Sequence, residues 1–319
     1  MDAVIPLADL QPIYSVAEVD RAMGDGAAKR NEGLKSWYDR MRELGGSRYI
    51  IKPSTAAAVD ELYGASPNFS SVVDDLRKFL ALAVAGHEAV QFTPMLLLGE
   101  PGLGKTYFAK RLAQALATGF EFVSMSSLTA GWVLTGASAQ WHNARPGKVA
   151  QTLIEGEYAN PVVVLDEVDK AGGDARYDPM GALYTLLERD TALHFKDEFI
   201  DVDIDASHIL WVATANDESS IPEPILNRMN VYEIDRPDAE GSRRIALSVY
   251  REILDAHRWP FPPEPSDTVL DRLAAIPPRD MRKLLLDAFG TAQLAGRDHL
   301  VPEDIDSRKL CGRRARVGF

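Results

Sequence analysis

The feature that most constrains the fold is the string MLLLGEPGLGKT at residues 95–106. Four apolar residues run directly into a GxxxxGKT motif, and an amphipathic stretch follows at 105–117. This pattern predicts a buried strand, a glycine-rich turn and a helix. Glycines let the backbone point its N–H groups at phosphate oxygens, and the helix adds its positive end. By average residue usage such a string arises by accident in about one chain in a hundred, and the flanking strand and helix lower that chance.

The residue types within the motif predict contacts to a bound nucleoside triphosphate. Lys105 is expected to reach the β- and γ-phosphates, and the Thr106 hydroxyl to ligate Mg²⁺. A nucleoside triphosphate with Mg²⁺ is therefore the expected ligand. The nucleotide is expected to be bound by the whole loop, which comprises Glu100, Pro101, Gly102, Leu103, Gly104, Lys105, Thr106 and Tyr107.

Four further apolar runs predict strands that alternate with helices. The runs span 120–123, 162–165, 209–213 and 231–234, with helical stretches near 147–158 and 179–189 between them. This alternation indicates a parallel sheet covered by helices on both faces. After residue 237 helical patterns alone follow, at 239–257, 267–275 and 279–295. The expected fold class is therefore α/β, with a P-loop large domain and a small helical domain.

The length of 319 residues fits one large and one small domain. We expect an N-terminal arm at 1–65, mostly helical or partly ordered, and a nucleotide-binding domain at 66–237. A helical domain at 238–306 and a basic tail at 307–319 are expected to follow. The apolar face of a predicted helix at 34–44 is expected to pack on the body of the protein or to dock a partner.

Composition excludes several classes of protein. The net charge is −12 and the tail contributes +5, so the rest of the chain carries −17 and binding of nucleic acid is disfavoured. A single cysteine excludes an internal disulfide. The N-terminus lacks the pattern of a signal peptide, and no apolar stretch is long enough to span a bilayer. A soluble cytoplasmic protein without membrane contact is expected.

Two more predicted strands end in polar residues that suit the chemistry of a nucleotide site. The run at 162–165 leads into Asp166, expected to hold the Mg²⁺, and Glu167, expected to orient or deprotonate the attacking water. The run at 209–213 leads to Asn216, which is expected to position that water. The alternative for the two acids is an ordinary surface strand end, and for Asn216 it is simple turn chemistry.

In this order the motifs resemble AAA+ ATPases and, most closely, the ATPase module of Lon proteases. The likeness covers roughly residues 90–310, whereas residues 1–65 show none. It is carried by the phosphate loop, by NPVVVLDEVDK at 160–170, by DPMGALYTLL at 178–187, by ATAN at 213–216 and by IPEPILNRM at 221–229.

The resemblance implies roles for residues outside the phosphate loop. Asn216 corresponds to sensor 1, and Arg228 to the arginine finger that reaches the ATP of a neighbouring subunit. A homo-oligomeric ring, usually a hexamer in this family, is therefore expected. The alternative for Arg228 is a surface ion pair. Arg279 takes the place of sensor 2, although prolines replace the family's glycine there, and Arg282 is the alternative.

The segment 140–148 resembles the Lon pore loop, in which an aromatic and an aliphatic residue grip the threaded polypeptide. The corresponding pair here is Trp141 and His142, and His142 departs from the pattern because it is polar. The alternative is that Trp141 packs as core under the loop. A second loop at 194–199 matches a family hairpin, and its Phe195 is expected to face the same channel.

The resemblance implies that ATP hydrolysis drives remodelling, unfolding or translocation of protein substrates. One alternative is a nucleotide-controlled switch that acts on a dedicated partner through residues 1–65. A weaker alternative is a nucleic-acid motor or loader, which is supported only by the basic tail. Lon proteases continue into a Ser–Lys protease domain, whereas this chain ends at Phe319 near its expected start. Protease activity is therefore not expected in this chain, and a separate protease could act downstream.

Overall fold

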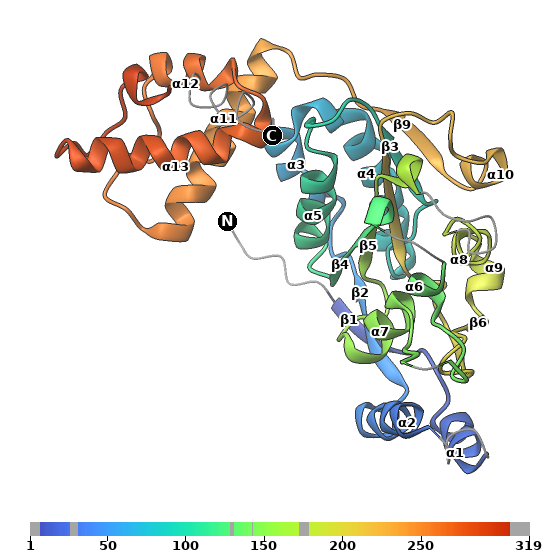
Figure 1. Cartoon of the computed structure of the whole chain (residues 1–319). Helices are drawn as coiled ribbons and strands as arrows, with labels where there is room; N and C mark the ends of the chain where they lie inside the picture. Colours follow the sequence, from blue (N-terminus) through green and yellow to red (C-terminus); the bar gives the residue numbers. More distant parts are fainter. Residues whose placement is uncertain (1–6, 26–30, 128–130, 142, 172–178, 307–319) are drawn as a thin grey trace, which may run out of the picture. The chain divides into compact units, whose positions relative to one another are not determined.

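The computed structural model describes residues 7–25, 31–127, 131–141, 143–171 and 179–306. The chain divides into two compact units (Figure 1). Unit 1 contains Met1–Val59, Asp74–Gly99 and Ala109–Glu233, and unit 2 contains Asp60–Val73, Glu100–Phe108 and Ile234–Phe319. Each unit has its own hydrophobic core. Unit 1 contains the sheet, and unit 2 is helical around its core.

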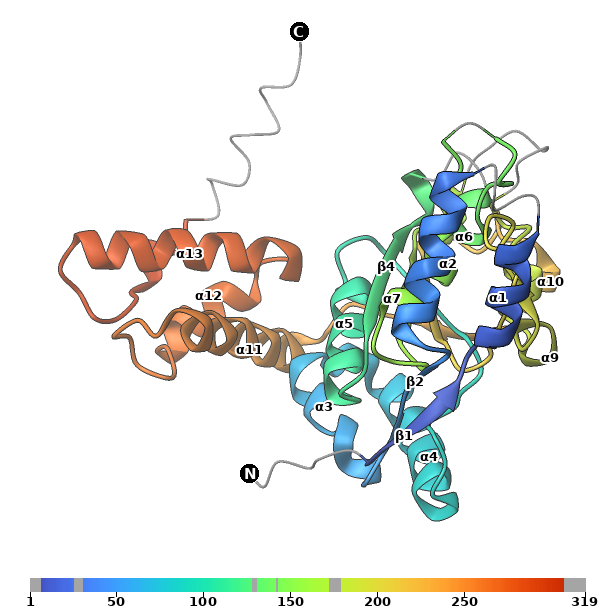
Figure 2. The same cartoon turned by 90° about the horizontal axis from the view of Figure 1, so that it is seen from below.

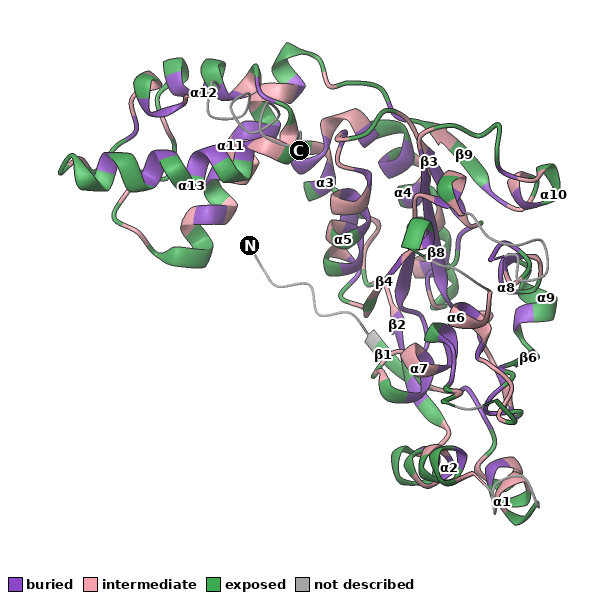
Figure 3. Cartoon of the chain, in the orientation of Figure 1, coloured by how far each residue is buried: buried purple, intermediate pink, exposed green. Residues whose placement is uncertain are grey.

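A five-stranded parallel sheet organises unit 1. The strand order is β4-β5-β8-β3-β9, and every neighbouring pair is parallel. The central strands β5 and β8 are buried apart from the last residue of β5, because their apolar residues are covered on both faces (Figure 3). The strands are β3 (Met95–Leu98), β4 (Phe120–Ser124), β5 (Val162–Asp166), β8 (Leu210–Ala215) and β9 (Asn230–Glu233). The predicted α/β class with five parallel strands is confirmed.

Helices flank the sheet of unit 1. They are α4 (Ser70–Gly86), α5 (Lys105–Ala115), α6 (Trp132–Thr135), α7 (Lys148–Glu155), α8 (Leu183–Leu186), α9 (Arg189–Ala192) and α10 (Glu223–Leu226). The single helix predicted near 179–189 is instead two short helices, α8 and α9. Glu188, between them, has extended backbone dihedrals (φ −105°, ψ 128°) that interrupt the helical path.

A short antiparallel hairpin, β6 (Phe195–Lys196) with β7 (Asp203–Ile204), precedes β8. Phe195 is 2% exposed and belongs to the core of unit 1. The expectation that it faces a channel was therefore wrong, because strand alternation turns its side chain inward and Lys196 outward.

The N-terminal segment adds an antiparallel pair of strands and two helices to unit 1. These are β1 (Leu7–Pro12), α1 (Val16–Gly24), α2 (Glu32–Leu44) and β2 (Ser47–Lys52), and α1 and α2 lie side by side (Figure 2). Leu34, Tyr38 and Met41 of α2 are buried in the core of unit 1, and the Tyr38 hydroxyl donates to the Ile200 carbonyl at 2.8 Å. The apolar face at 34–44 therefore packs on the body of the protein.

Unit 2 is built on three helices, α11 (Ala239–His257), α12 (Asp267–Ala274) and α13 (Pro278–Leu294), close to the ranges predicted. It also contains α3 (Glu61–Ala65) and a short 3-10 turn at Pro302–Asp304. Phe289 is the centre of its aromatic core, 5.2 Å from the ring of Tyr250 and 4.7 Å from that of Phe261. Pro278 suits the first turn of α13, where a backbone N–H has no helical partner.

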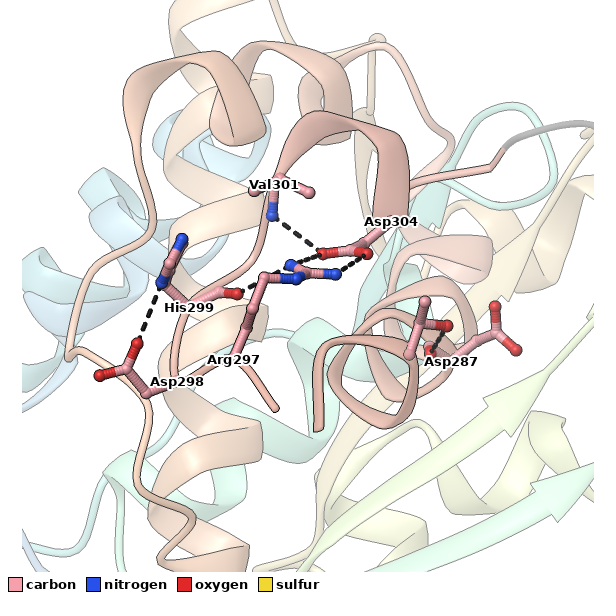
Figure 4. Close-up of polar contacts among 7 residues, drawn as sticks. Asp287, Arg297, Asp298, His299, Val301 and Asp304 are labelled. Carbon is pink, nitrogen blue, oxygen red and sulfur yellow. Dashed lines mark hydrogen bonds and ion pairs between the residues drawn. The ribbon is translucent and has the colours of Figure 1, made fainter. Parts of the chain in front are cut away.

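After α13, Arg297 and Asp304 form an ion pair that we call the clamp (Figure 4). Two guanidinium nitrogens donate to the two carboxylate oxygens at 2.7 Å each, and the Val301 N–H donates to the same carboxylate at 2.9 Å. The Asp304 side chain is buried. Hydrogen bonding from Arg297 lowers the pKa of Asp304 below its ordinary value, so this carboxylate is charged in the folded protein at neutral pH.

Candidate functional site

The carboxyl ends of β5 and β8 meet at one edge of the sheet and bring the predicted acids of unit 1 together. The Thr214 hydroxyl donates to Asp166 Oδ1 at 2.9 Å and accepts the N–H of Glu167 at 3.0 Å. Thr214 is 2% exposed, so both hydrogen bonds are shielded from water. Thr214 was not among the predicted site residues, although its place two residues before Asn216, in the same predicted strand, was a usable signal.

Glu167 leaves the end of β5 in a left-handed backbone conformation (φ 56°, ψ 52°). A non-glycine residue there is uncommon, and the local hydrogen bonds hold it in place. Its carboxylate pairs with the Lys170 ammonium, and this hydrogen bond raises the pKa of Lys170. The predicted general base is therefore set at a sharp turn directly after the strand.

Asn216 follows β8 at the same edge. Its N–H donates to Asp169 Oδ2 at 3.2 Å, and the Ser220 hydroxyl donates to the Asp169 carbonyl at 2.8 Å. The Gly99 N–H at the end of β3 donates to the Ala215 carbonyl at 3.2 Å. Asp169 was not predicted, and it fixes the backbone of Asn216 relative to the turn that contains Glu167.

The glycine-rich loop beyond Gly99 belongs to unit 2 and has the backbone that its sequence predicts. Gly102 and Gly104 have φ values of +89° and +90°, a region in which side chains are strained. α5 begins at Lys105, and the Phe108 N–H donates to the Gly104 carbonyl at 2.8 Å. Lys105 is buried, and its Nζ donates to the Glu100 carbonyl at 3.1 Å.

Within unit 2 the two sensor 2 candidates differ in their surroundings. A β-carbon added at Gly102 would lie 3.1 Å from Arg279 Cδ, so the stem of Arg279 passes next to the phosphate loop. Arg282 instead donates to Glu252 Oε1 at 2.8 Å, and Tyr107 donates to Oε2 of the same glutamate at 2.9 Å. The structure therefore favours Arg279 by position, and its role in contacting phosphate stays a prediction.

The arginine finger candidate makes its contacts with α8, α9 and α10 of unit 1. Arg228 Nη2 lies 2.7 Å from Glu188 Oε1, and Nη1 donates to the Pro224 carbonyl at 2.5 Å. The guanidinium carbon is 5.7 Å from the centroid of the Tyr184 ring. The surface ion pair considered as the alternative is thus present, and it holds the guanidinium in a defined position.

The predicted substrate loop presents Trp141, which is 51% exposed and packs edge-to-face on Trp132 with centroids 5.5 Å apart. Core packing of Trp141, the alternative, is therefore not observed. His142 lies outside the described residues. Asp197 is fully buried below the loop, and its carboxylate accepts the Gly147 N–H at 2.7 Å and those of Phe199 and Ile200 at 2.9 and 3.1 Å. Burial raises its pKa to about 6.

The carboxylate at the sheet edge of unit 1 is of the kind that a magnesium ion takes. Mg²⁺ keeps several waters and is usually bound by one or two carboxylates together with substrate phosphates. Asp166 ends β5 as such a carboxylate, and its role as a magnesium ligand, like that of Thr106 in the loop of unit 2, stays a prediction. Across the described residues no group of three or more His, Cys, Asp or Glu side chains could hold a metal ion by itself. No helix in this part of the chain is long and apolar enough to cross a membrane.

Comparison with known proteins agrees with this arrangement. The model of the "ATPase family associated with various cellular activities (AAA)" matches residues 95–235. Lon protease 2 of Hydrogenovibrio crunogenus is 32% identical over 227 residues, which are 71% of this chain and 25% of that protein. The mitochondrial Lon protease homolog of Aspergillus fumigatus is 32% identical over 240 residues, 75% of this chain and 20% of that protein.

Two solved structures share the fold. The Thermotoga maritima RuvB Holliday junction branch migration motor is 18% identical, with a TM-score of 0.51 over 74% of this chain and 66% of that chain. The S. cerevisiae Hsp104:casein complex is 18% identical, with a TM-score of 0.58 over 74% of this chain and 47% of that chain. At this identity both comparisons support the architecture alone.

Residues 95–235 therefore form a domain of the AAA ATPase family, and the chain is homologous to part of the Lon proteases, as the motifs predicted. The chain spans about a quarter or less of the length of these curated relatives.

Proposed function

We propose that this ATPase works as a ring of identical subunits, by family expectation a hexamer, that remodels, unfolds or translocates protein substrates. The observation that carries the proposal is the half-exposed Trp141 on a loop whose base is held by the buried Asp197. An indole offers a large apolar contact that tolerates many sequences, which suits a grip on varied polypeptides. A loop attached to the core through Gly147 can transmit motion of the sheet to that grip.

The proposed chemistry follows from the charged groups and from the backbone of the loop. The N–H groups between Glu100 and Tyr107 and the Lys105 ammonium bind the phosphates. Asp166 and Thr106 would hold Mg²⁺, which neutralises charge on the phosphates when it is bound. Glu167 orients the attacking water and takes its proton, and Asn216 holds that water in line.

Two arginines complete the proposed site. Arg279, next to Gly102 in unit 2, contacts the γ-phosphate in the same subunit. Arg228 acts on the ATP of a neighbouring subunit, where a fixed guanidinium stabilises charge that develops during phosphoryl transfer. Hydrolysis in this scheme depends on assembly, because each site is incomplete without its neighbour. Proteolysis forms no part of the proposal.

The test is the effect of an unfolded protein on ATP hydrolysis. Unfolded casein should raise the ATPase rate of the wild type, and Trp141→Ala should abolish that stimulation while basal hydrolysis changes less than about twofold. Tyr49→Ala is the matched control, because Tyr49 is 52% exposed on β2, away from the loop. Stimulation that survives in Trp141→Ala would contradict the assignment of the grip.

A nucleic-acid motor predicts a different result. Salt-sensitive binding of DNA or RNA that disappears when residues 307–319 are deleted would favour that function, because the tail carries five basic residues and no acidic ones. The charge of −17 on the rest of the chain makes us expect no such binding at physiological salt.

A further inference from the structure

The side chain of Arg228 is held by three groups of its own subunit, all within unit 1. Glu188 Oε1 forms an ion pair with Nη2 at 2.7 Å, the Pro224 carbonyl accepts from Nη1 at 2.5 Å, and the Tyr184 ring lies 5.7 Å from the guanidinium carbon. A guanidinium carries five N–H donors. The hydrogen bond to Pro224 and the ion pair with Glu188 each engage one terminal nitrogen, so both nitrogens can offer a further N–H to another acceptor.

The same side chain is partly shielded and yet accessible at its tip. The Arg228 side chain is 25% exposed, and its Nε is buried without a hydrogen-bond partner in the described part of the chain. Arg228 and Glu188 both line an open groove of about 940 Å³. The stem of the arginine is therefore fixed, and its terminal nitrogens remain next to solvent.

The backbone around Glu188 is held by hydrogen bonds and by packing. It is the N-cap residue of α9, and its neighbour Arg189 donates to Gln91 Oε1 at 2.9 Å. The preceding helix α8 packs through Leu183 and Leu186 into the core that also contains Ile225 of α10. The carboxylate and the guanidinium thus approach each other from two elements that share one rigid core.

We propose that Glu188 is a positioning residue for the arginine finger: it holds the Arg228 guanidinium in the orientation in which its free N–H donors meet the γ-phosphate of the neighbouring subunit. This inference rests on the proposed role of Arg228. A long flexible side chain loses rotamer entropy when it is fixed, and a local carboxylate supplies this order before the phosphate arrives. The carboxylate also partly neutralises a cation that must leave water at a subunit interface.

The first test is a double-mutant cycle on the ATPase rate. Glu188→Ala should lower kcat by about 10-fold to 100-fold, because a misplaced catalytic group loses its effect steeply with distance, and should leave KM for ATP unchanged. Glu188→Gln keeps an acceptor for Nη2 and should recover part of the loss. The double variant Glu188→Ala/Arg228→Ala should be no slower than Arg228→Ala alone, because Glu188 acts only through the finger.

Asp190→Asn is the matched control, because Asp190 is an exposed acid on the same short helix and should give wild-type rates. Additive losses in the double variant, a raised KM in Glu188→Ala, or loss of the oligomer in Glu188→Ala would each overturn the proposal. These outcomes would show that Glu188 serves nucleotide binding or folding rather than the finger.

The second test separates this inference from the ring itself. Arg228→Ala and Lys105→Ala should each be nearly inactive alone and should regain activity when mixed, because the Lys105→Ala subunit still donates a finger. A Lys105→Ala/Glu188→Ala donor should restore about tenfold less. Equal restoration would overturn the role of Glu188 and leave the ring proposal intact. Mixing with Lys105→Ala could restore no activity while the double-mutant cycle is non-additive. In that case the proposal that Arg228 acts on a neighbouring subunit is wrong, and Glu188 still positions Arg228.

Discussion

At the scale of single residues, Thr214 connects the two acids proposed for catalysis. The Thr214 hydroxyl donates a hydrogen bond to Asp166 Oδ1 at 2.9 Å and accepts one from the Glu167 N–H at 3.0 Å. Both groups sit at the start of a turn in which Glu167 has a positive φ. A carboxylate that must orient a ligand benefits from a partner that fixes its rotamer, and this threonine is the buried partner available at the sheet edge.

Thr214→Val is a shape-conserving change that removes this hydroxyl. We expect kcat to fall by about 10-fold and the free energy of unfolding to fall by about 1–2 kcal/mol, because two buried polar groups lose a partner. Steady-state ATPase assays and urea unfolding measure the two effects. Thr152→Val is the control, since the Thr152 hydroxyl donates only to the Lys148 carbonyl on the exposed side of α7. An unchanged kcat in Thr214→Val would remove Thr214 from the site.

Sequence reasoning found the residues of the phosphate loop and the acids after β5 because their spacing is local. Gly102, Gly104 and Lys105 lie within one turn, and the loop geometry follows from what glycine permits. It missed Thr214 and Asp169, whose roles depend on which strands become neighbours in the sheet. The pairing of β5 with β8 brings residues almost fifty positions apart into contact, as in the bond from Thr214 to Asp166.

At the scale of elements, the end of unit 2 is held by an ion pair between the buried Asp304 and the partly exposed Arg297. Arg297 follows α13, and Asp304 lies in the turn at Pro302–Asp304 that contacts α13 and α12. Two parallel hydrogen bonds of 2.7 Å give this pair a fixed geometry. Removing Arg297 leaves the Asp304 carboxylate charged and buried, so the turn should detach before the rest of the unit.

The pH dependence of this clamp has a definite sign. The pKa of Asp304 is lowered in the folded protein, mainly by hydrogen bonding from Arg297. The pair therefore stabilises the protein above the ordinary aspartate pKa, and this contribution is lost as the pH falls through the lowered folded value. Wild-type stability should drop more steeply below about pH 4 than that of Asp304→Asn.

Urea unfolding between pH 3 and pH 7, followed by tryptophan fluorescence, measures this difference. Near pH 7 the Asp304→Asn variant should be less stable by about 1–2 kcal/mol, and the gap should close in acid. A gap that stays constant over this pH range would mean that the charge of Asp304 contributes nothing. Asp298→Asn is the control, because Asp298 is exposed and its carboxylate pairs with its neighbour His299.

Helices and strands were predicted where burial produces a recognisable apolar pattern in the sequence, and they were missed where it does not. The runs at 95–98 and 162–165 are apolar because both faces of a central strand are covered, so both strands were predicted. β1 was not, because its residues 8–10 are exposed and its sequence LADLQP has no alternation to detect. The break between α8 and α9 depends on the extended backbone dihedrals of Glu188, and no local sequence pattern indicates them.

At the scale of the whole molecule, the proposed function requires subunits that complete one another's sites. Arg228 is held in an orientation that leaves donors free at its tip, and the carboxylates of the sheet edge lie elsewhere in unit 1. Assembly should therefore depend on nucleotide, because ATP with its bound Mg²⁺ would bring finger and phosphates together across the interface. The state of the nucleotide would then control the oligomer.

Glu167→Gln tests this coupling, because it removes the base and keeps the shape of the side chain. We expect kcat to fall by about 1,000-fold while ATP binding is retained, and light scattering should show a larger oligomer with ATP and Mg²⁺ than without nucleotide. Addition of EDTA should reverse the assembly. A monomer under all these conditions would contradict the ring, and Glu218→Gln, an exposed acid beyond β8, should behave as the wild type.

The sequence by itself determined the phosphate loop, the five parallel strands, the three long helices of unit 2 and the acids at the end of β5, because each depends on neighbours in the chain. Only the tertiary structure decided which side chains support them. Thr214 under Asp166, Asp197 under the Trp141 loop and Glu188 beside Arg228 are all contacts between segments separated along the chain. Hydrogen bonds and packing across a folded sheet depend on distances in space. These distances are set by the folded chain and cannot be read from the order of residues in the sequence.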